Sequence, residues 1–141
     1  MRKDQATRSQ GSFISRWRNR LSAVMLNRQG AALYNKGEYR QAIEEFTRAI
    51  EASPDFAESY DRRGKSYAAL GEHRQAIEDY NKAVAFDPDF AQAYLDRATS
   101  LQATGELDRG MADLTRAIRI QPDFLAAYTQ RIAIHRARGD E

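Results

Sequence analysis

Few side chains in this chain of 141 residues have the type and spacing that chemistry needs. The chain contains no cysteine, which excludes disulfides, thiolate metal ligands and cysteine nucleophiles. No carboxylate or serine lies at an informative spacing from His73 or His135, and we interpret both histidines as structural. The sequence also lacks a glycine-rich phosphate loop and a cluster of metal ligands. We therefore predict a protein that is not an enzyme and needs no cofactor or metal.

A period of 34 residues organises the rest of the chain. Its three prolines stand 34 residues apart: Pro54, Pro88 and Pro122. Four glycines keep the same interval: Gly37, Gly71, Gly105 and Gly139. A fixed period of this size indicates stacked repeats. Alignment on the prolines gives three complete units and a half-unit: residues 23–56, 57–90, 91–124 and 125–141.

Each unit has the pattern of a helical hairpin. In the second unit, apolar and small residues recur at helical spacing on both sides of Gly71, and Pro88 follows the second helix. Glycine tolerates the left-handed conformation that ends a helix, and proline cannot continue one. The columns on the first helices are Leu26, Tyr60, Tyr94 and Tyr128, then Gly30, Gly64, Ala98 and Ile132, then Leu33, Tyr67 and Leu101. Those on the second helices are Ala42, Ala76 and Gly110, then Phe46, Tyr80 and Leu114, then Ala49, Ala83 and Ala117.

These columns resemble the tetratricopeptide repeat (TPR) family over residues 23–124 and over the first helix of a fourth unit. The resemblance implies an all-α fold, a right-handed α-solenoid of stacked antiparallel helix hairpins with three TPR units and a closing helix. Two positions depart from the family pattern. Gly110 replaces the usual alanine, so we expect the second helix of the third unit to be the weakest. Ile132 occupies a column that is normally small.

The resemblance also implies a scaffold that binds a peptide or helix of a partner protein in a concave groove lined by the first helices. Helical spacing directs eleven polar side chains toward that groove: Asn27, Arg28, Glu58, Asp61, Arg62, Lys65, Gln92, Asp96, Thr99, Thr129 and Gln130. Their mixed charges favour a partner that carries both signs. Alternatively, the charged members only solvate an exposed face or pair with one another, each pair contributing ~0–1 kcal/mol.

One subset of the family grips the free C-terminal carboxylate of chaperones with lysine, arginine and asparagine side chains. The matching positions in this chain are Asn27, Ala31, Arg62, Gln92 and Asp96. None of them holds the required residue, and the carboxylate of Asp96 would repel the carboxylate of the tail. We therefore expect this chain not to bind chaperone tails.

Three arginines recur beside the tyrosine column: Arg63, Arg97 and Arg131. We interpret them as structural, with stems packed on tyrosine and guanidinium groups bound to carboxylates at the repeat junctions.

The N-terminal segment is separate from the repeats. We expect residues 1–11 to be a disordered basic tail and residues 12–22 to be an amphipathic helix with the apolar stripe Phe13, Trp17 and Leu21. This helix has three alternatives: it breaks near Ser22 and caps the first repeat, it contacts a partner protein or a second copy, or it lies on an anionic membrane. The segment has no aromatic stacking sites or recognition-helix motif, so we expect no nucleic-acid partner.

The formal net charge of +2 conceals a basic segment and an acidic scaffold. Residues 1–28 hold seven basic groups and one acid, and residues 29–141 hold fifteen basic groups and nineteen acids. This asymmetry favours contact between the two parts, within one chain or between copies. The sequence has no apolar run typical of a membrane span or signal peptide, so we expect a cytoplasmic protein, with a mitochondrial-type presequence in residues 1–22 as the alternative.

Two functions are consistent with these patterns. The first is a non-enzymatic adaptor that binds a protein segment in its groove. The alternative is a structural protein that forms a homo-oligomer through its N-terminal helix or its open repeat ends. Residues 125–141 are either a capping helix or the first half of a further repeat.

Overall fold

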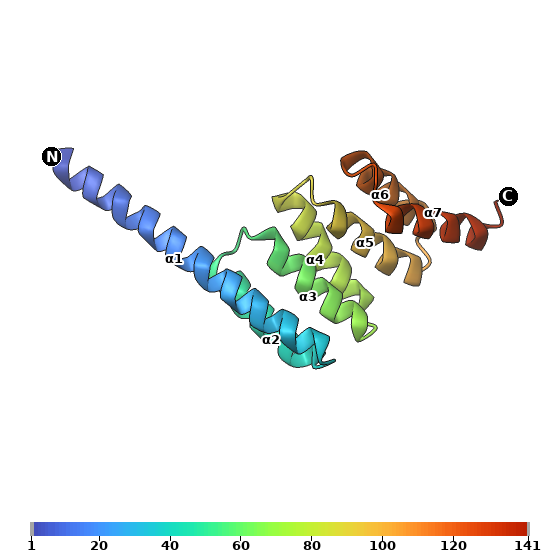
Figure 1. The fold of residues 1–141 in the computed structure, drawn as a ribbon, viewed down its shortest axis with the longest axis horizontal. Helices are drawn as coiled ribbons and strands as arrows, with labels where there is room; N and C mark the ends of the chain where they lie inside the picture. Colours follow the sequence, from blue (N-terminus) through green and yellow to red (C-terminus); the bar gives the residue numbers. More distant parts are fainter. Residues whose placement is uncertain (1, 141) are drawn as a thin grey trace.

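The computed structural model describes residues 2–140, which form seven α-helices and no strand. The helices are α1 (Arg2–Asn35), α2 (Tyr39–Ala52), α3 (Ala57–Ala69), α4 (His73–Phe86), α5 (Ala91–Ala103), α6 (Leu107–Ile120) and α7 (Leu125–Arg138). Consecutive helices pair as antiparallel hairpins, which stack side by side from α1 to α7 (Figure 1). The predicted all-α solenoid of helix hairpins is confirmed. None of the helices in residues 2–140 is both long and apolar enough to cross a membrane.

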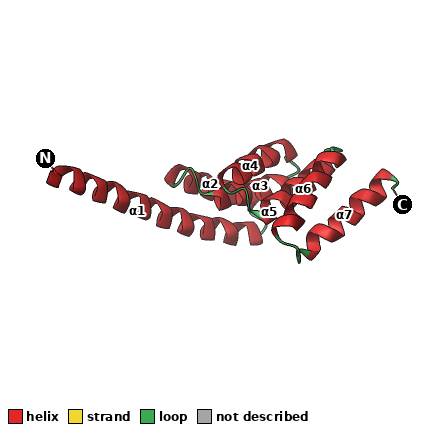
Figure 2. Ribbon diagram, turned by 90° about the horizontal axis from the view of Figure 1, so that it is seen from above, coloured by secondary structure: helices red, strands yellow, loops and turns green. Residues whose placement is uncertain are grey.

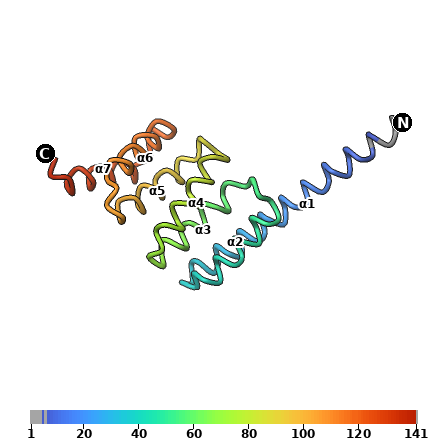
Figure 3. Tube along the Cα trace, turned by 180° about the vertical axis from the view of Figure 1, so that it is seen from behind, coloured from blue at the N-terminus to red at the C-terminus, as the bar shows by residue number. Residues whose placement is uncertain are grey.

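The first and second helices of the hairpins form two layers. Seen from above, α2 and α4 lie on one side of the stack, whereas α1 and α7 lie on the other (Figure 2). From behind, the N-terminal part of α1 and the end of α7 lie at opposite ends of the molecule (Figure 3). The first helices α1, α3, α5 and α7 contact one another in that order, so one continuous face of the molecule is built from them alone.

Small and aromatic residues set the spacing within each hairpin. A Cβ atom added at Gly64 would lie 2.6 Å from Cε1 of Tyr80, and one added at Gly30 would lie 2.5 Å from Cε1 of Phe46. The ring of the second helix thus fills the space that the missing side chain of the first helix leaves, as the columns predicted. Each turn is closed by a glycine in the left-handed region, where side chains are disfavoured, as at Gly71 with φ of 77°.

The tyrosine column adds a bond that the sequence pattern did not reveal. The hydroxyl of Tyr60 donates to the carbonyl oxygen of Pro54 at 2.6 Å. The corresponding tyrosines of the next two units repeat this bond to Pro88 at 3.0 Å and to Pro122 at 2.9 Å. Each bond crosses six residues and fixes the start of a first helix against the turn before it.

Two of the three periodic arginines, Arg63 and Arg97, bind a carboxylate of their own hairpin. Arg63 on α3 donates to both oxygens of Asp79 on α4, at 2.8 and 2.9 Å, and to Oγ1 of Thr47 on α2 at 3.2 Å. Arg97 repeats the arrangement with Asp113 and with Asn81 of the preceding unit. We expected carboxylates at the repeat junction, whereas Arg63 and Arg97 contact Thr47 and Asn81 there.

The N-terminal segment differs from the prediction. Residues 2–11 belong to α1, where we expected a disordered tail, and α1 continues without a break past Ser22. The helix therefore does not fold back to cap the first repeat. Its first half, which we call the arm (residues 2–19), projects beyond the stack in Figure 1. The reason is local: the arm contains no proline and only one glycine, Gly11, and helices elongate readily once nucleated.

The C-terminal helix α7 also differs from the prediction at one position. We placed His135 in a core column, yet its side chain is half exposed, with Nδ1 at 3.5 Å from Asp140. Ile132 is exposed as well, because no described helix packs on this side of α7.

Candidate functional site

The candidate site is the face built by the first helices, which we call the groove. Two hollows lie along it. One of about 120 Å³ is lined by residues of α1, α2 and α3, and one of about 160 Å³ by residues of α1, α3, α4 and α5. Tyr34 and Lys65 line both hollows, so the two adjoin. The ammonium group of Lys65 lies 5.6 Å from the centre of the Tyr34 ring, a cation–π contact across the boundary between the first two units.

Several predicted groove residues bind one another at the surface. Arg62 donates to Glu58 one turn away on α3 at 2.7 Å. Gln130 on α7 donates to Thr99 on α5 at 2.8 Å and so joins two first helices. These contacts fit the view that part of the set only pairs and solvates. Arg28, Thr99 and Thr129 are exposed, whereas Glu58, Lys65, Gln92 and Gln130 are partly exposed.

Three other predicted groove residues are buried. Asn27 and Asp61 are each only 4 % exposed, and Asp96 is 9 % exposed. They lie between the first helices, because the close contact that the small columns permit leaves little room there. They form part of the floor of the groove and not its rim.

The polar atoms of this floor are incompletely paired. Asp96 accepts a hydrogen bond from Nε2 of Gln92 at 2.9 Å. Oδ1 of Asp61, Oδ2 of Asp96 and both amide atoms of Asn27 are buried and have no hydrogen-bond partner. Unpaired buried polar atoms are rare in folded proteins, since each costs about 1–3 kcal/mol. The floor of the groove is therefore the least satisfied polar region of the described chain.

Asp61 and Asp96 interact directly, and we refer to them as the acid pair. Burial, followed by the charge of Asp96 and a hydrogen bond to it, raises the pKa of Asp61 well above its usual value. Burial also raises the pKa of Asp96, although the hydrogen bonds from Asp61 and Gln92 oppose this. Two buried carboxyl groups that interact in this way cannot both ionise easily, which favours the protonated form of Asp61. Sequence reasoning missed this contact because the two residues are 35 positions apart.

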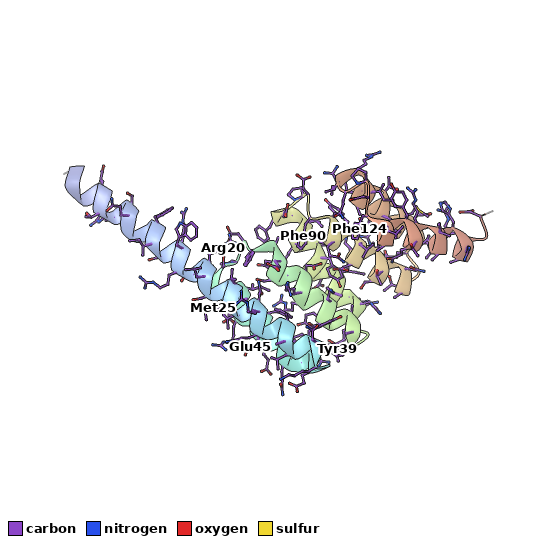
Figure 4. The ribbon with its side chains drawn as sticks, viewed as in Figure 1. Arg20, Met25, Tyr39, Glu45, Phe90 and Phe124 are labelled. Atoms are coloured by element: carbon purple, nitrogen blue, oxygen red, sulfur yellow. The ribbon has the colours of Figure 1, made fainter. Side chains whose placement is uncertain are left out.

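Arg20 connects the arm to the turn between α2 and α3. The guanidinium of Arg20 stacks on the ring of Phe56 at 4.4 Å and binds Asp55 at 3.3 Å. Figure 4 shows Arg20 where α1 leaves the stack, and Phe90 and Phe124 near the corresponding turns of later units. The predicted stripe is uncovered on both sides of Arg20, with Phe13, Trp17 and Leu21 all 56–62 % exposed.

The described residues contain no group of three or more histidine, cysteine, aspartate or glutamate side chains that could hold a metal ion. His73 lies at the start of α4 with Nδ1 at 3.1 Å from Oγ of Ser100. This contact ties α4 to α5.

A stack of helical hairpins with this period is the architecture of a repeat protein that presents one continuous face. The TPR repeat family matches residues 30–71 and 64–105, and the tetratricopeptide repeat matches residues 91–124. The chain belongs to the tetratricopeptide repeat family. No curated protein sequence matches it.

Solved structures with a similar fold are TPR domains. The first TPR of Spaghetti (RPAP3), bound to the HSP90 peptide SRMEEVD, is 25% identical, with a TM-score of 0.83 over 86% of this chain and 96% of that one. The first TPR domain of human RPAP3 is also 25% identical, with a TM-score of 0.82 over 84% of this chain and 93% of that one. The second TPR domain of human RPAP3, in complex with the HSP70 peptide SGPTIEEVD, is 24% identical, with a TM-score of 0.77 over 84% and 97%.

These similarities bear on the expectation about chaperone tails. The first TPR of Spaghetti (RPAP3) holds an HSP90 peptide, which weighs against the expectation that this chain does not bind chaperone tails. The five positions that correspond to the carboxylate-binding residues of the chaperone-binding subset are Asn27, Ala31, Arg62, Gln92 and Asp96 in this chain.

Proposed function

We propose that this protein is a non-enzymatic adaptor that binds a segment of a partner protein in the groove of α1, α3, α5 and α7. The observation that carries the proposal is the pair of adjoining hollows that share Tyr34 and Lys65. An extended peptide or a helix laid across the first helices would meet both hollows. The peptide complexes of similar TPR domains support this mode of binding.

The charges of the groove indicate what the partner presents. Arg28, Arg62 and Lys65 are cationic, and Glu58 and Asp96 are anionic, so both signs are available within the groove. Electrostatic complementarity of this kind selects the register of a bound segment more than it raises affinity. A partner segment with both acidic and basic side chains matches it best.

A displayed library of random peptides, selected on the full chain, tests the proposal. Peptides enriched on the native chain are measured against the groove variant Arg62→Ala/Lys65→Ala and the matched variant Arg74→Ala/Lys82→Ala, whose residues lie on α4. We expect the groove variant to lose at least about tenfold in affinity, roughly 1.4 kcal/mol, and the α4 variant to bind as the native chain does. Equal binding by both variants, or no enriched peptide, would overturn the proposal.

The tail peptides SRMEEVD and SGPTIEEVD form a separate arm of the same experiment. Each is measured with a free and with an amidated C-terminus. Because Asp96 stands where a cation would bind the tail, we expect no preference for the free carboxylate. A loss of binding on amidation would show instead that this groove accepts chaperone tails through other residues.

The exposed arm favours a second candidate, self-assembly through α1. The stripe Phe13, Trp17 and Leu21 is more than half exposed, and apolar patches of this kind commonly mark interfaces. Light-scattering mass across protein concentrations tests it. Association that Trp17→Ser removes and Leu125→Ser preserves would place the interface on the arm, because Leu125 lies exposed at the open end of the stack. A monomer at every concentration would exclude self-assembly.

A further inference from the structure

An apolar face along α1 is left unexplained by the groove. Five side chains, all more than half exposed, form this face, which we call the outer face: Phe13, Ile14, Trp17, Leu21 and Met25. At helical spacing they fall within an arc of about 120°. Met25 lies on the side of α1 opposite to the buried residues Ala23 and Asn27, so the outer face continues from the arm onto the stack on the side away from α2 and α3.

Arginines flank the outer face on both edges. Arg16 and Arg20 follow one edge and Arg18 the other. Arg20 is bound to Asp55, whereas Arg16 and Arg18 are exposed and form no ion pair with a residue that the structure describes. Residues 5–37 contain six basic residues and no acid, so no acidic side chain of this segment offsets the charge. An apolar face with arginines at both edges is typical of a helix that lies in the interface of a membrane.

Aromatic rings and guanidinium groups adjoin on this side of α1. Phe13, Arg16, Trp17 and Arg20 together line one hollow of about 310 Å³. The rings of Phe13 and Trp17 meet edge to face, with their centres 6.2 Å apart. A lipid presents an anionic headgroup directly above apolar chains, so a lipid surface offers a partner to both kinds of side chain.

We propose that α1 binds the surface of an anionic lipid bilayer, with the outer face in the headgroup region and with Arg16 and Arg18 at the lipid phosphates. This inference goes beyond the proposed adaptor function and leaves the groove free for its partner. The aliphatic stems of the arginines can cover apolar surface while their guanidinium groups reach the phosphates. Trp17 has the amphipathic ring that is enriched at this depth of a membrane.

The acidic scaffold is compatible with such a contact because the arm extends beyond it. Residues 29–141 hold fifteen basic groups and nineteen acids, so an anionic surface repels them. The arm projects beyond the stack (Figure 1), and the contacts of Arg20 with Asp55 and Phe56 fix its start. The arm can therefore lie on a bilayer while the repeats remain in the surrounding water.

A second copy of the chain would compete for the outer face. Two arms packed together would bring Arg16 and Arg18 of both chains close to one another, and neither chain has an acid in residues 5–37 to offset them. Like charges brought together at a contact destabilise it. The charge of the arm therefore favours an anionic bilayer over a second arm.

Trp17 provides the readout of the test, since it is the only tryptophan of the chain. The full chain is titrated with vesicles of phosphatidylcholine alone and with vesicles of equal parts of phosphatidylcholine and phosphatidylglycerol. We expect a saturable blue shift of the emission with the anionic vesicles, at least about tenfold weaker binding to phosphatidylcholine, and weaker binding as salt is raised. No shift with the anionic vesicles, or equal affinity for both kinds of vesicle, would overturn the inference.

A pair of charge variants assigns the binding to the arm. Arg16→Gln/Arg18→Gln should bind the anionic vesicles at least about tenfold more weakly than the native chain. Arg74→Gln/Lys82→Gln removes the same charge from exposed positions of α4 and should bind as the native chain does. Equal binding by the two variants would mean that the arm does not hold the lipid, and the inference would fail.

A second pair of variants tests the apolar contact. Phe13→Ser/Leu21→Ser retains Trp17 and every charge, and we expect it to lose the blue shift. Leu125→Ser, which changes an exposed leucine at the other end of the stack, should preserve it. Circular dichroism checks that the helices are kept. If the serine variant loses helix, the charge variants decide, because glutamine favours a helix about as well as arginine does.

Self-assembly and failure of the groove give different results. Emission that is blue-shifted without vesicles, and that moves to longer wavelength on dilution, would show that a second copy covers Trp17 and would overturn the inference. The groove variant Arg62→Ala/Lys65→Ala should bind vesicles as the native chain does, and Arg16→Gln/Arg18→Gln should bind the selected peptides unchanged. Loss of the groove function therefore leaves lipid binding intact, and the reverse also holds.

Discussion

Arg63 on α3 holds both carboxylate oxygens of Asp79 on α4, at 2.8 and 2.9 Å, with Asp79 only 4 % exposed. The hydrogen bonds to Asp79 raise the pKa of Arg63. Burial raises the pKa of Asp79 despite those same bonds. The first effect favours the ionised pair and the second favours the neutral acid, while the two short bonds have the fork geometry of an arginine–carboxylate ion pair. Because Thr47 on α2 accepts a third bond, one side chain joins two adjacent hairpins.

Removing Arg63 should therefore destabilise the stack more than removing a surface arginine. Arg63→Met leaves the carboxylate of Asp79 buried and unpaired, and breaking a buried pair in this way costs about 3–5 kcal/mol. Urea unfolding measures the change. The control is Arg48→Met, whose partner Glu45 lies three residues away on the surface of α2 and whose loss should cost ~0–1 kcal/mol. Equal losses for the two variants would contradict the structural role of Arg63.

Position 64 should tolerate no side chain. Gly64→Leu places new atoms against the ring of Tyr80, to which even a Cβ would come within 2.6 Å. We expect destabilisation by about 1–3 kcal/mol or more, measured as the free energy of unfolding. Gly11→Leu is the matched change, since nothing lies within 4 Å of a Cβ at position 11. There the substitution should be neutral or slightly stabilising, because leucine favours a helix more than glycine does.

The acid pair should make stability depend on pH. The pKa of Asp61 is higher in the folded chain than its usual value of 3.8, so the protonated form is favoured by folding. This contribution is complete below pH 3.8 and is lost as pH rises through the folded pKa. Asp61→Asn mimics the neutral acid, and we expect it to unfold at a higher urea concentration than the native chain at pH 7.

At pH 3 the advantage of Asp61→Asn should vanish, because both chains are then neutral at this position. Asp123→Asn, at an exposed turn, serves as the control and should show no such change with pH. If the Asp61→Asn variant is less stable than the native chain at pH 7, Asp61 is ionised in the fold. Because Asp61 and Asp96 are both buried, we expect a lysine at either position to destabilise the fold.

The arm should contribute little to the stability of the repeats. The side chains described from Thr7 to Asn19 are exposed, and Arg20 is where α1 first contacts the turn after α2, through Asp55 and Phe56. Deletion of residues 2–19 is expected to change the free energy of unfolding by less than about 0.5 kcal/mol. Deletion of residues 2–20, which also removes the guanidinium on Phe56, should cost more, in the range of about 0.5–1 kcal/mol for such a contact. Thermal melts of the two truncations separate these outcomes.

The helical hairpins, their number and their spacing could be predicted from the sequence. The interval of 34 residues, the glycines at the turns and the pairing of Gly64 with an aromatic residue follow from local backbone preferences and helical periodicity. Backbone preferences and helical periodicity act between residues that are close in the sequence, so the residue pattern along the chain reveals them. The arginine that recurs at the position of Arg63 in later units also indicated a structural role, although the sequence did not identify Asp79 as its partner.

Which polar residues of the groove are buried could not be predicted from the sequence. Helical spacing gives the direction of Asp61 and Asp96, but their burial depends on how closely α3 approaches α5, and that distance is set by packing between units. Two side chains that helical spacing placed on an exposed face are thereby buried, and burial raises the pKa of both. The sequence left open whether the first helix breaks near Ser22. In the fold α1 continues past Ser22, Arg20 contacts Asp55 and Phe56 of the turn after α2, and the apolar stripe stays more than half exposed.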